Sequence, residues 1–294
     1  MLRKQFGSVA RRTLCLGVLT VILVSSAGAS GKYQVLHSFN CATDGCGPTG
    51  DLIFDAQGSL YGSAADTVFK LTPSGGHWTL SVLHLFNILS QGETLWAGVT
   101  FDSSGNLYGT TVNGSTYDLG TAFELTPHAG GWTLDVLHSF SGGNDGDSPF
   151  APVVLDKAGN AYGTTQGSTV FELTPSSGGD WTETVIYGFR AKGDGSTPEA
   201  GLIWDAAGNL YGTTAYGGAI TKGCEGCGTV FKLSPNSGGW KEHVLYRFQW
   251  VPGGPDGYAP YGSVIFDNAG NLYGTTAYGG SSDGCFDGCG TVFN

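Results

Sequence analysis

The sequence predicts an all-β fold, a five-bladed β-propeller of four-stranded blades. Three observations lead to this prediction: one unit recurs five times, each unit holds several short strand-like segments, and the composition favours strands. The chain has 51 Gly, a single Met and many Thr, Tyr and Phe, which is typical of β-structure. No sustained helical periodicity appears after residue 29.

The repeat is clearest in the motif L-Y-G-T-T and its variants. Its tyrosine recurs as Tyr61, Tyr108, Tyr162, Tyr211 and Tyr273, at spacings of 47, 54, 49 and 62 residues. A motif close to T-V-F-K-L-T-P follows each time, at 67–73, 121–127, 169–175, 229–235 and, cut short, 291–293. An apolar segment such as 201–205 precedes the tyrosine motif, and in four units a Trp leading to a V-L-H-S-F-like run comes last.

Each unit therefore contains four strand-like segments separated by Gly, Pro, Asp and Asn turn signals. We call them the first, second, third and fourth strand of a unit. Four strands in roughly 50 residues is the pattern of a propeller blade. A β-helix would use much shorter coils, and a single sandwich would not repeat itself in this way.

The ends of the array predict how the ring closes. The chain stops at Asn294, inside the third strand of the fifth unit, and residues 33–39 read as a fourth strand with no unit before it. We expect residues 33–39 to complete the last blade beside 291–293, because this closure would remove exposed sheet edges. Terminal strands lying far apart would instead suggest a truncated chain with blades missing.

Residues 1–29 are predicted to be a signal peptide, and residues 30–294 the propeller domain. Four basic residues precede an apolar run at 14–24, and Ala27-Gly28-Ala29 offers a cleavage site. The run is too short for a comfortable membrane span, so we expect no span once the signal is removed. Arg11-Arg12 matches the twin-arginine motif only in part, which leaves the Sec and twin-arginine routes both open. The expected location is the periplasm, the cell surface or the medium.

The mature chain is strongly acidic. Removing residues 1–29 takes away four of thirteen basic residues and none of the twenty-four acidic ones, which leaves a net charge of −15. Nucleic acids and anionic membranes need basic patches on their partners. We therefore expect neither as a partner, and the oligomeric state stays open.

The units also resemble a known family, the GloVer-type tandem repeats of bacterial exported proteins. The hallmarks G-N-L-Y-G-T-T, G-T-V-F-K-L-T-P and D-G-x-x-P-x-A-G-L stand here at 208–214, 228–235 (with Ser234 for the Thr) and 194–202. The resemblance covers essentially the whole mature chain. It implies a propeller-like fold and an envelope or extracellular location, and it implies no activity or catalytic residues.

Most recurring polar residues are predicted to be parts of the scaffold. The D-x-x-G turns at Asp55, Asp102, Asp156, Asp205 and Asp267 suit a hairpin between the first and second strands. Calcium is the alternative, but one carboxylate among Gly and Ala makes a poor cage. The histidines of the fourth strand share their position with tyrosines in other units, so we do not assign them to a metal or a base. No Ser/His/Asp or H-x-x-x-H pattern appears.

The candidate binding site lies where loops vary. Antiparallel strands place the second-to-third and fourth-to-first loops at one end of each blade, here called the loop face, and the other two turns at the opposite end, the turn face. Turn-face sequences are nearly constant, whereas loop-face sequences vary, and variable loops on a rigid scaffold usually carry binding. The candidate binding residues are Asp44, Asp145, Asp194, Asp256, Tyr216 and Tyr278. The aspartates could form an acidic collar for a cation or sugar hydroxyls, or could simply make the turn into the first strand.

The six mature cysteines also belong to the loop face. We predict three local disulfides, because exported proteins favour them: Cys41–Cys46, Cys224–Cys227 and Cys285–Cys289. Zinc is the alternative, because closely spaced cysteines on adjacent blades could converge on one ion. We favour no cofactor and assign no metal site.

These features favour an exported, non-catalytic binding or surface-interaction module. A carbohydrate or cell-surface polymer is the expected ligand class, because the loop face is acidic and rich in Tyr and Trp. A glycan lyase or hydrolase is the first alternative and would need a carboxylate pair, or a His/Tyr/Arg group, unique to one or two blades. A purely structural envelope protein is the second, and the fold alone does not choose among the three.

Overall fold

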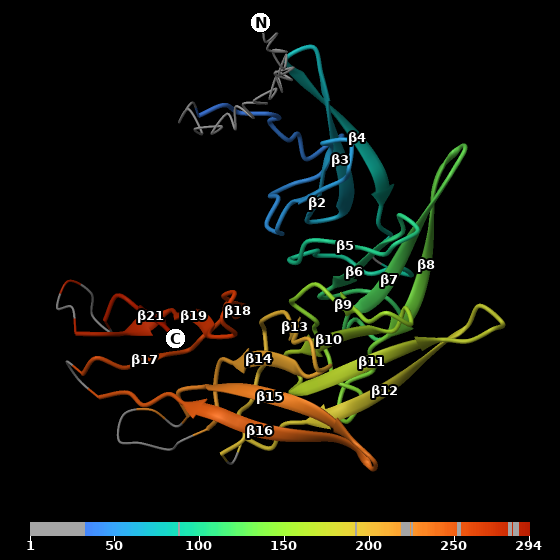
Figure 1. The fold of residues 1–294 in the computed structure, drawn as a ribbon. Coiled ribbons are helices and arrows are strands. Elements are labelled where there is room, and N and C mark those ends of the chain that lie inside the picture. Colours follow the sequence, from blue (N-terminus) through green and yellow to red (C-terminus); the bar gives the residue numbers. More distant parts are fainter. Residues whose placement is uncertain are drawn as a thin grey trace, which may run out of the picture. The chain divides into compact units, whose positions relative to one another are not determined.

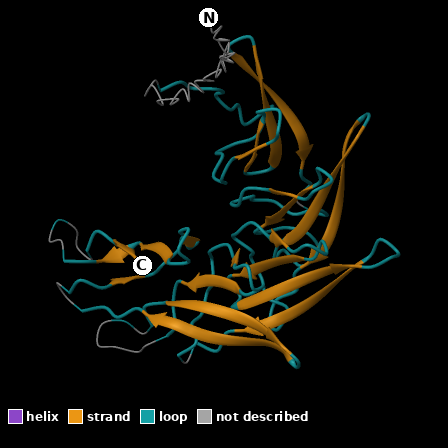
Figure 2. Ribbon diagram, viewed as in Figure 1, coloured by secondary structure: helices purple, strands orange, loops and turns teal. Residues whose placement is uncertain are grey.

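The computed structural model describes residues 33–294 except 88, 192, 219–223, 225, 252–253, 282–283 and 285–287. The predicted signal peptide lies outside these residues. Residues Leu36–Asn294 form one compact unit, and of the other unit, Met1–Val35, only residues 33–35 are described. The described residues form strands and loops without helices (Figure 2). No helix among them is long and apolar enough to cross a bilayer.

The protein is a five-bladed β-propeller, as predicted, and its blades follow the repeats in order (Figure 1). Blade one is β1 (Ile53–Phe54), β2 (Leu60–Ala64), β3 (Thr67–Ser74) and β4 (His77–Leu85). Blade two is β5 (Thr100–Phe101), β6 (Leu107–Thr111), β7 (Thr121–His128) and β8 (Gly131–Ser139). Blade three is β9 (Val154–Leu155), β10 (Ala161–Thr165), β11 (Thr169–Pro175) and β12 (Trp181–Gly188). Blade four is β13 (Ile203–Trp204), β14 (Leu210–Thr214), β15 (Thr229–Asn236) and β16 (Gly239–Arg247).

Blade five contains three paired strands, β18 (Ile265–Phe266), β19 (Leu272–Thr276) and β21 (Thr291–Phe293). A small ladder of β17 (Gly257–Tyr258) and β20 (Tyr278–Gly279) lies in its loops. All ladders between named strands are antiparallel, and in blades one to four they join strands that are neighbours in the sequence, so the loop face and the turn face alternate along the chain as predicted.

The second strand is the most buried element of each blade. In blades one to three all five of its residues are buried, because both sides of the strand are covered. The central glycine of L-Y-G-T-T has a steric cause: a Cβ at Gly109 would lie 2.5 Å from Cζ of Phe123 on the next strand. The motif thus combines large side chains with one position where a ring presses on the backbone.

Consecutive blades are joined by phenylalanine pairs. The Phe that follows each fourth strand packs against the third-strand Phe of the next blade, edge-on in three pairs and tilted in the fourth, with ring centroids 4.8–5.1 Å apart. These pairs are Phe86–Phe123, Phe140–Phe171, Phe189–Phe231 and Phe248–Phe293. Edge-to-face geometry at this distance is favourable for aromatic rings.

The predicted ring-closing pair is not formed. Residues 33–39 adopt no strand, and β21 pairs only with β19 among the described residues. Instead, Leu36 and Phe39 pack against the core of blade one, and the Phe39 ring lies 4.9 Å from Phe69. This is the contact that each fourth strand makes with the blade after it. Side-chain packing onto blade one therefore holds this segment without any ladder to β21.

Each turn between the first and second strands is built around its aspartate. Asp55 Oδ1 accepts the backbone N–H groups of Gln57 and Ser59 at 2.9 and 2.8 Å, and Oδ2 accepts the hydroxyl of Tyr61 at 3.2 Å. The two N–H contacts recur at Asp102, Asp156, Asp205 and Asp267. These carboxylates stabilise the hairpin between the first and second strands, which is the scaffold role that the D-x-x-G motif predicts.

Candidate functional site

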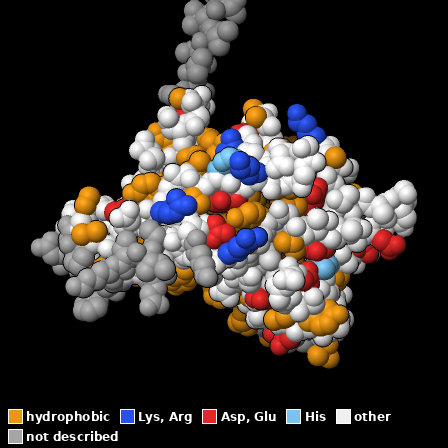
Figure 3. Space-filling model, turned by 90° about the horizontal axis from the view of Figure 1, so that it is seen from below, with side chains coloured by type: hydrophobic (Ala, Val, Ile, Leu, Met, Phe, Trp, Pro, Cys, Tyr) orange, Lys and Arg blue, Asp and Glu red, His pale blue; other side chains and the backbone are white. Residues whose placement is uncertain are grey.

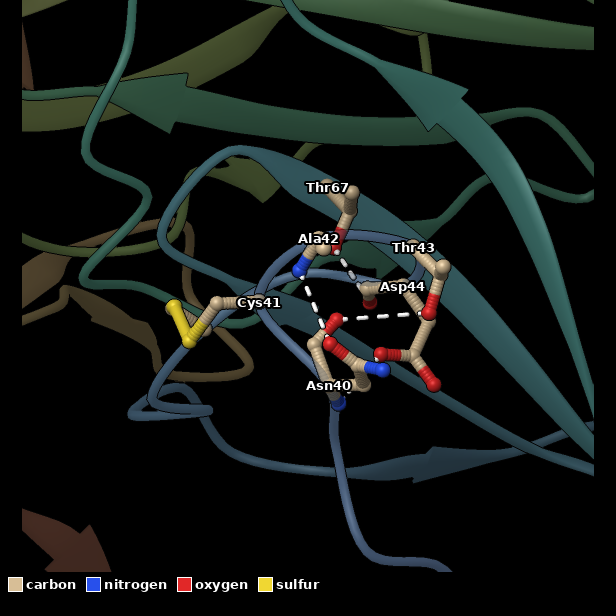
Figure 4. The surroundings of a disulfide bond; sticks show 7 residues. Asn40, Cys41, Ala42, Thr43, Asp44 and Thr67 are labelled. Atoms are coloured by element: carbon tan, nitrogen blue, oxygen red, sulfur yellow. Dashed lines mark hydrogen bonds between the residues drawn. A yellow bond between two sulfur atoms is a disulfide. The ribbon is translucent and has the colours of Figure 1, made fainter.

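The loop-face aspartates are bonded to the strand that precedes them. Asp44 Oδ2 lies 2.8 Å from Nε2 of His37, and Asp44 Oδ1 accepts the N–H of Asn40. Figure 4 shows this compact turn, with Thr67 donating to the backbone carbonyl of Asp44. Backbone donation from Asn40 and the His37 contacts hold the pKa of the Asp44 carboxyl below its usual value of 3.8.

The same pairing recurs in three other loops. Asp145 lies 2.8 Å from His138, Asp194 accepts from Tyr187 at 3.0 Å, and Asp256 accepts from Tyr246 at 3.1 Å. In the loop that leads from blade one into blade two, Gln91 takes the carboxylate's place beside His84 at 3.0 Å. Histidine and tyrosine exchange at this position because both can donate to an acceptor in the loop. Each aspartate thus bonds within its own loop, and no hydrogen bond among the described residues joins the four into a collar.

Tyr216 and Tyr278, by contrast, lie in one cluster. The hydroxyl of Tyr216 lies 2.8 Å from that of Tyr261, and the ring of Tyr278 stacks on Tyr258 with centroids 5.1 Å apart. Burial, followed by the Tyr216 hydroxyl and weaker effects of Glu199 and Tyr278, raises the pKa of Tyr261. We call these four tyrosines the tyrosine surface.

The tyrosine surface is open to solvent and borders a small cavity. Tyr216 is 48% exposed and Tyr278 41% exposed. A cavity of 310 Å³ lies beside Tyr216, and its other walls include Tyr258, Ser196 and Cys224. Its volume is at the small end of the range of about 300–1,000 Å³ common for ligand pockets. Two of the predicted binding residues therefore help to form one aromatic surface on the loop face.

Tyr261 marks a variable position that the sequence interpretation missed. It lies four residues before the first strand of its blade, where the other blades carry Thr49, Trp96, Phe150 and Glu199. Trp96 and Phe150 approach each other across blades two and three, with centroids 6.1 Å apart, and Glu199 accepts a hydrogen bond from Gln166 at 2.8 Å. Aligning the repeats at this register shows a position that changes in every blade while its surroundings repeat.

Disulfides brace the loop face. Cys41 bonds to Cys46, and Cys224, which lines the cavity, bonds to Cys227. Cys289 is also disulfide-bonded, and Cys285 lies outside the described residues. Sulfurs engaged in disulfides do not offer thiolates to a metal, so Cys41, Cys46, Cys224, Cys227 and Cys289 form no zinc site in this structure.

A larger groove lies on the turn face between blades three and four. Its volume is 740 Å³, and its walls include Tyr162, Trp204, Trp240, Leu155 and Lys157. The indole Nε1 of Trp204 is buried without a hydrogen-bond partner among the described residues. The nearly constant turn motifs concealed this groove, because the two residues that differ, Leu155 and Trp204, stand in the first strands where other blades carry Phe.

Two solved structures illustrate the fold. The extracellular domain of BT4673 of B. thetaiotaomicron, assigned as a hybrid two-component system, aligns with a TM-score of 0.52 at 11% identity, covering 78% of this chain and 26% of that one. A luciferin-regenerating enzyme aligns with a TM-score of 0.51 at 16% identity, covering 82% of this chain and 75% of the enzyme. Identities this low show a shared fold alone, and this chain spans only 26% of the first protein.

The sequence repeat identifies the family. No curated protein matches the chain. The model of the Gloeobacter/Verrucomicrobia repeat matches residues 63–293, from the second strand of blade one to the third strand of blade five. The chain therefore belongs to the Gloeobacter/Verrucomicrobia repeat family, as its GloVer-type motifs indicate.

Proposed function

We propose that this protein is an exported, non-catalytic binding module whose tyrosine surface recognises a carbohydrate or another neutral cell-surface polymer. The observation that carries the proposal is the pair of exposed rings, Tyr216 and Tyr278, each held in place by a second tyrosine. Aromatic rings with a polar edge present an apolar face and a hydrogen-bonding group together, which suits a sugar ring. Rings already fixed before binding lose little conformational freedom when the ligand arrives.

Charge and covalent structure support this ligand class and location. A net charge of −15 in the mature chain disfavours polyanions. On the face shown in Figure 3, the described acidic and basic side chains lie interspersed with hydrophobic ones. The disulfides suit an oxidising compartment outside the cytoplasm.

The proposal is tested by measuring the binding of soluble neutral and anionic polysaccharides in affinity gels and by calorimetry. We expect at least one neutral polysaccharide to bind, and Tyr216→Ala and Tyr278→Ala each to weaken it about tenfold, which corresponds to roughly 1.4 kcal/mol. Tyr117→Ala is the matched control, because Tyr117 is 57% exposed in a loop-face loop of blade two. Wild-type affinity in both tyrosine variants would contradict the proposal.

The same polysaccharide-binding measurements distinguish this proposal from a turn-face site, a structural role and an enzyme. If Trp204→Phe weakens binding while Tyr216→Ala does not, the site is the turn-face groove. If the wild-type protein binds no polysaccharide, the structural role is favoured. Release of reducing ends from a bound polysaccharide would instead indicate a glycan-active enzyme.

A further inference from the structure

Two fourth strands carry a carboxylate where the others carry leucine. The second residue after the conserved Trp is Leu80 in blade one and Leu134 in blade two, and both leucines pack against the cores. Glu183 and Glu242 take this position in blades three and four. Oε1 of each glutamate is buried and has no hydrogen-bond partner among the described residues. A buried, unpartnered carboxylate oxygen is costly unless something binds it.

Glu183 lies beside a second carboxylate and a histidine from the preceding blade. One ligand atom each from His138, Asp145 and Glu183 lie within 4.8 Å of one another. His138 Nε2 and Asp145 Oδ1 are 2.8 Å apart. The N–H and the hydroxyl of Ser141 hold the other oxygen of Asp145, at 2.6 and 2.7 Å. The His138 imidazole and the Asp145 carboxylate are thus held next to each other, within reach of Glu183.

This combination is confined to one junction in the part of the chain that the structure describes. By register, the corresponding sets are His37, Asp44 and Leu80 at blade one; His84, Gln91 and Leu134 at blade two; and Tyr187, Asp194 and Glu242 at blade four. Each of these sets lacks at least one of the three ligand types. The histidine position alternates with tyrosine along the chain, as a scaffold position does, whereas the third ligand comes from the next blade.

We propose that His138, Asp145 and Glu183 bind a divalent transition-metal ion of the Zn²⁺ type across the junction of blades two and three. One imidazole and two carboxylates are ligands that zinc takes, with bonds of about 2.0–2.2 Å and an open position for water. Neighbouring ligand atoms on a tetrahedral ion with such bonds lie about 3.3–3.5 Å apart, so His138 Nε2 and Asp145 Oδ1, now 2.8 Å apart in a hydrogen bond, would separate by about half an ångström to admit the ion. Rotation of the Glu183 carboxylate would close the remaining gap, since its Oε1 has no hydrogen-bond partner in the described part of the chain.

Calorimetry with Zn²⁺ on EDTA-stripped, disulfide-intact protein without a polyhistidine tag tests the site. We expect one Zn²⁺ to bind and to raise the thermal midpoint. His138→Tyr and Glu183→Leu install the residues that other blades carry at these positions, so the fold has a precedent for both. Each should weaken binding by more than the roughly 10–100-fold that loss of an outer-shell partner causes.

Two matched variants provide the controls. His37→Tyr and Glu242→Leu make the same chemical changes at junctions without the full set, and both should bind Zn²⁺ as the wild type does. Thermal midpoints in EDTA establish that every variant is folded. Absence of stoichiometric binding to the wild-type protein overturns the proposal, as does unchanged binding in either His138→Tyr or Glu183→Leu. Loss of Zn²⁺ binding in His37→Tyr would also overturn the proposal.

Discussion

At the scale of single residues, the histidine or tyrosine near the end of the fourth strand shows what the sequence could predict and what it could not. The alternation of His37, His84 and His138 with tyrosines marked the end of the fourth strand as scaffold, and the structure shows each side chain bonded to a loop acceptor. What the sequence could not show is the distance across blades. Glu183 and His138 are 45 positions apart, and only packing of consecutive blades brings their side chains together.

The half-buried glutamate of blade four, Glu242, predicts a pH-dependent stability. Burial, reinforced by Asp194 and opposed by Arg247, raises the pKa of Glu242 from 4.5 to about 7. The folded state therefore holds a proton that the unfolded chain has released, so this contribution to stability is present below pH 4.5 and is lost as the pH rises through about 7. We expect Glu242→Leu to raise the thermal midpoint at pH 8 relative to wild type, and by less at pH 4.5.

Thermal scans of both proteins in EDTA at the two pH values give the comparison. Burial and the neighbouring charges of Glu242 and Asp194 raise the pKa of Tyr187 above its usual value of 10.0, so its hydroxyl stays protonated at both pH values. An equal difference at both pH values would show that Glu242 is not desolvated in the folded protein.

At the scale of elements, strands were predictable and surfaces between blades were not. Period, turn residues and the recurring tyrosine motif place all four strands of the first four blades, because each strand is specified by its own residues. The turn-face groove depends on Leu155 standing where other blades have Phe, next to Trp204. The tyrosine surface depends on Tyr261, four residues outside its strand. Both features are departures from the repeat, and their effect appears only when neighbouring blades are packed.

The glycine of the second strand gives a prediction about packing within a blade. A methyl group at position 109 would press on the Phe123 ring, whereas Gly130 meets nothing closer than 3.5 Å. We expect Gly109→Ala to lower the free energy of unfolding by about 1–3 kcal/mol, as overpacking in a tight core does, and Gly130→Ala to change it little. Urea unfolding followed by tryptophan fluorescence measures both, and equal midpoints for the two variants would show that the ring yields to the added methyl.

At the scale of the whole molecule, the phenylalanine pairs turn five separate sheets into one chain of contacts. Each pair joins a blade to the next, so the stability of a blade depends on its neighbour, as in other repeat proteins. The ring-closing pair that the sequence predicted is not formed among the described residues, although Leu36 and Phe39 make the side-chain contact with blade one that a fourth strand makes. A strand-like sequence predicts what a segment can pair with, but not whether the pairing forms.

These contacts predict that a phenylalanine pair between two blades contributes more to the free energy of unfolding than the Phe39–Phe69 pair does. Phe140 is fully buried between blades two and three, whereas Phe39 is only partly buried against blade one. Phe140→Ala should cost about 3–5 kcal/mol of unfolding free energy, the range for a large aromatic removed from a core. Phe39→Ala should cost clearly less, because its ring is only partly buried and so loses less contact with the core. Urea midpoints read by fluorescence and by far-ultraviolet circular dichroism should agree for Phe39→Ala, and a cost equal to that of Phe140→Ala would mean that residues 33–39 are buried between two blades in solution.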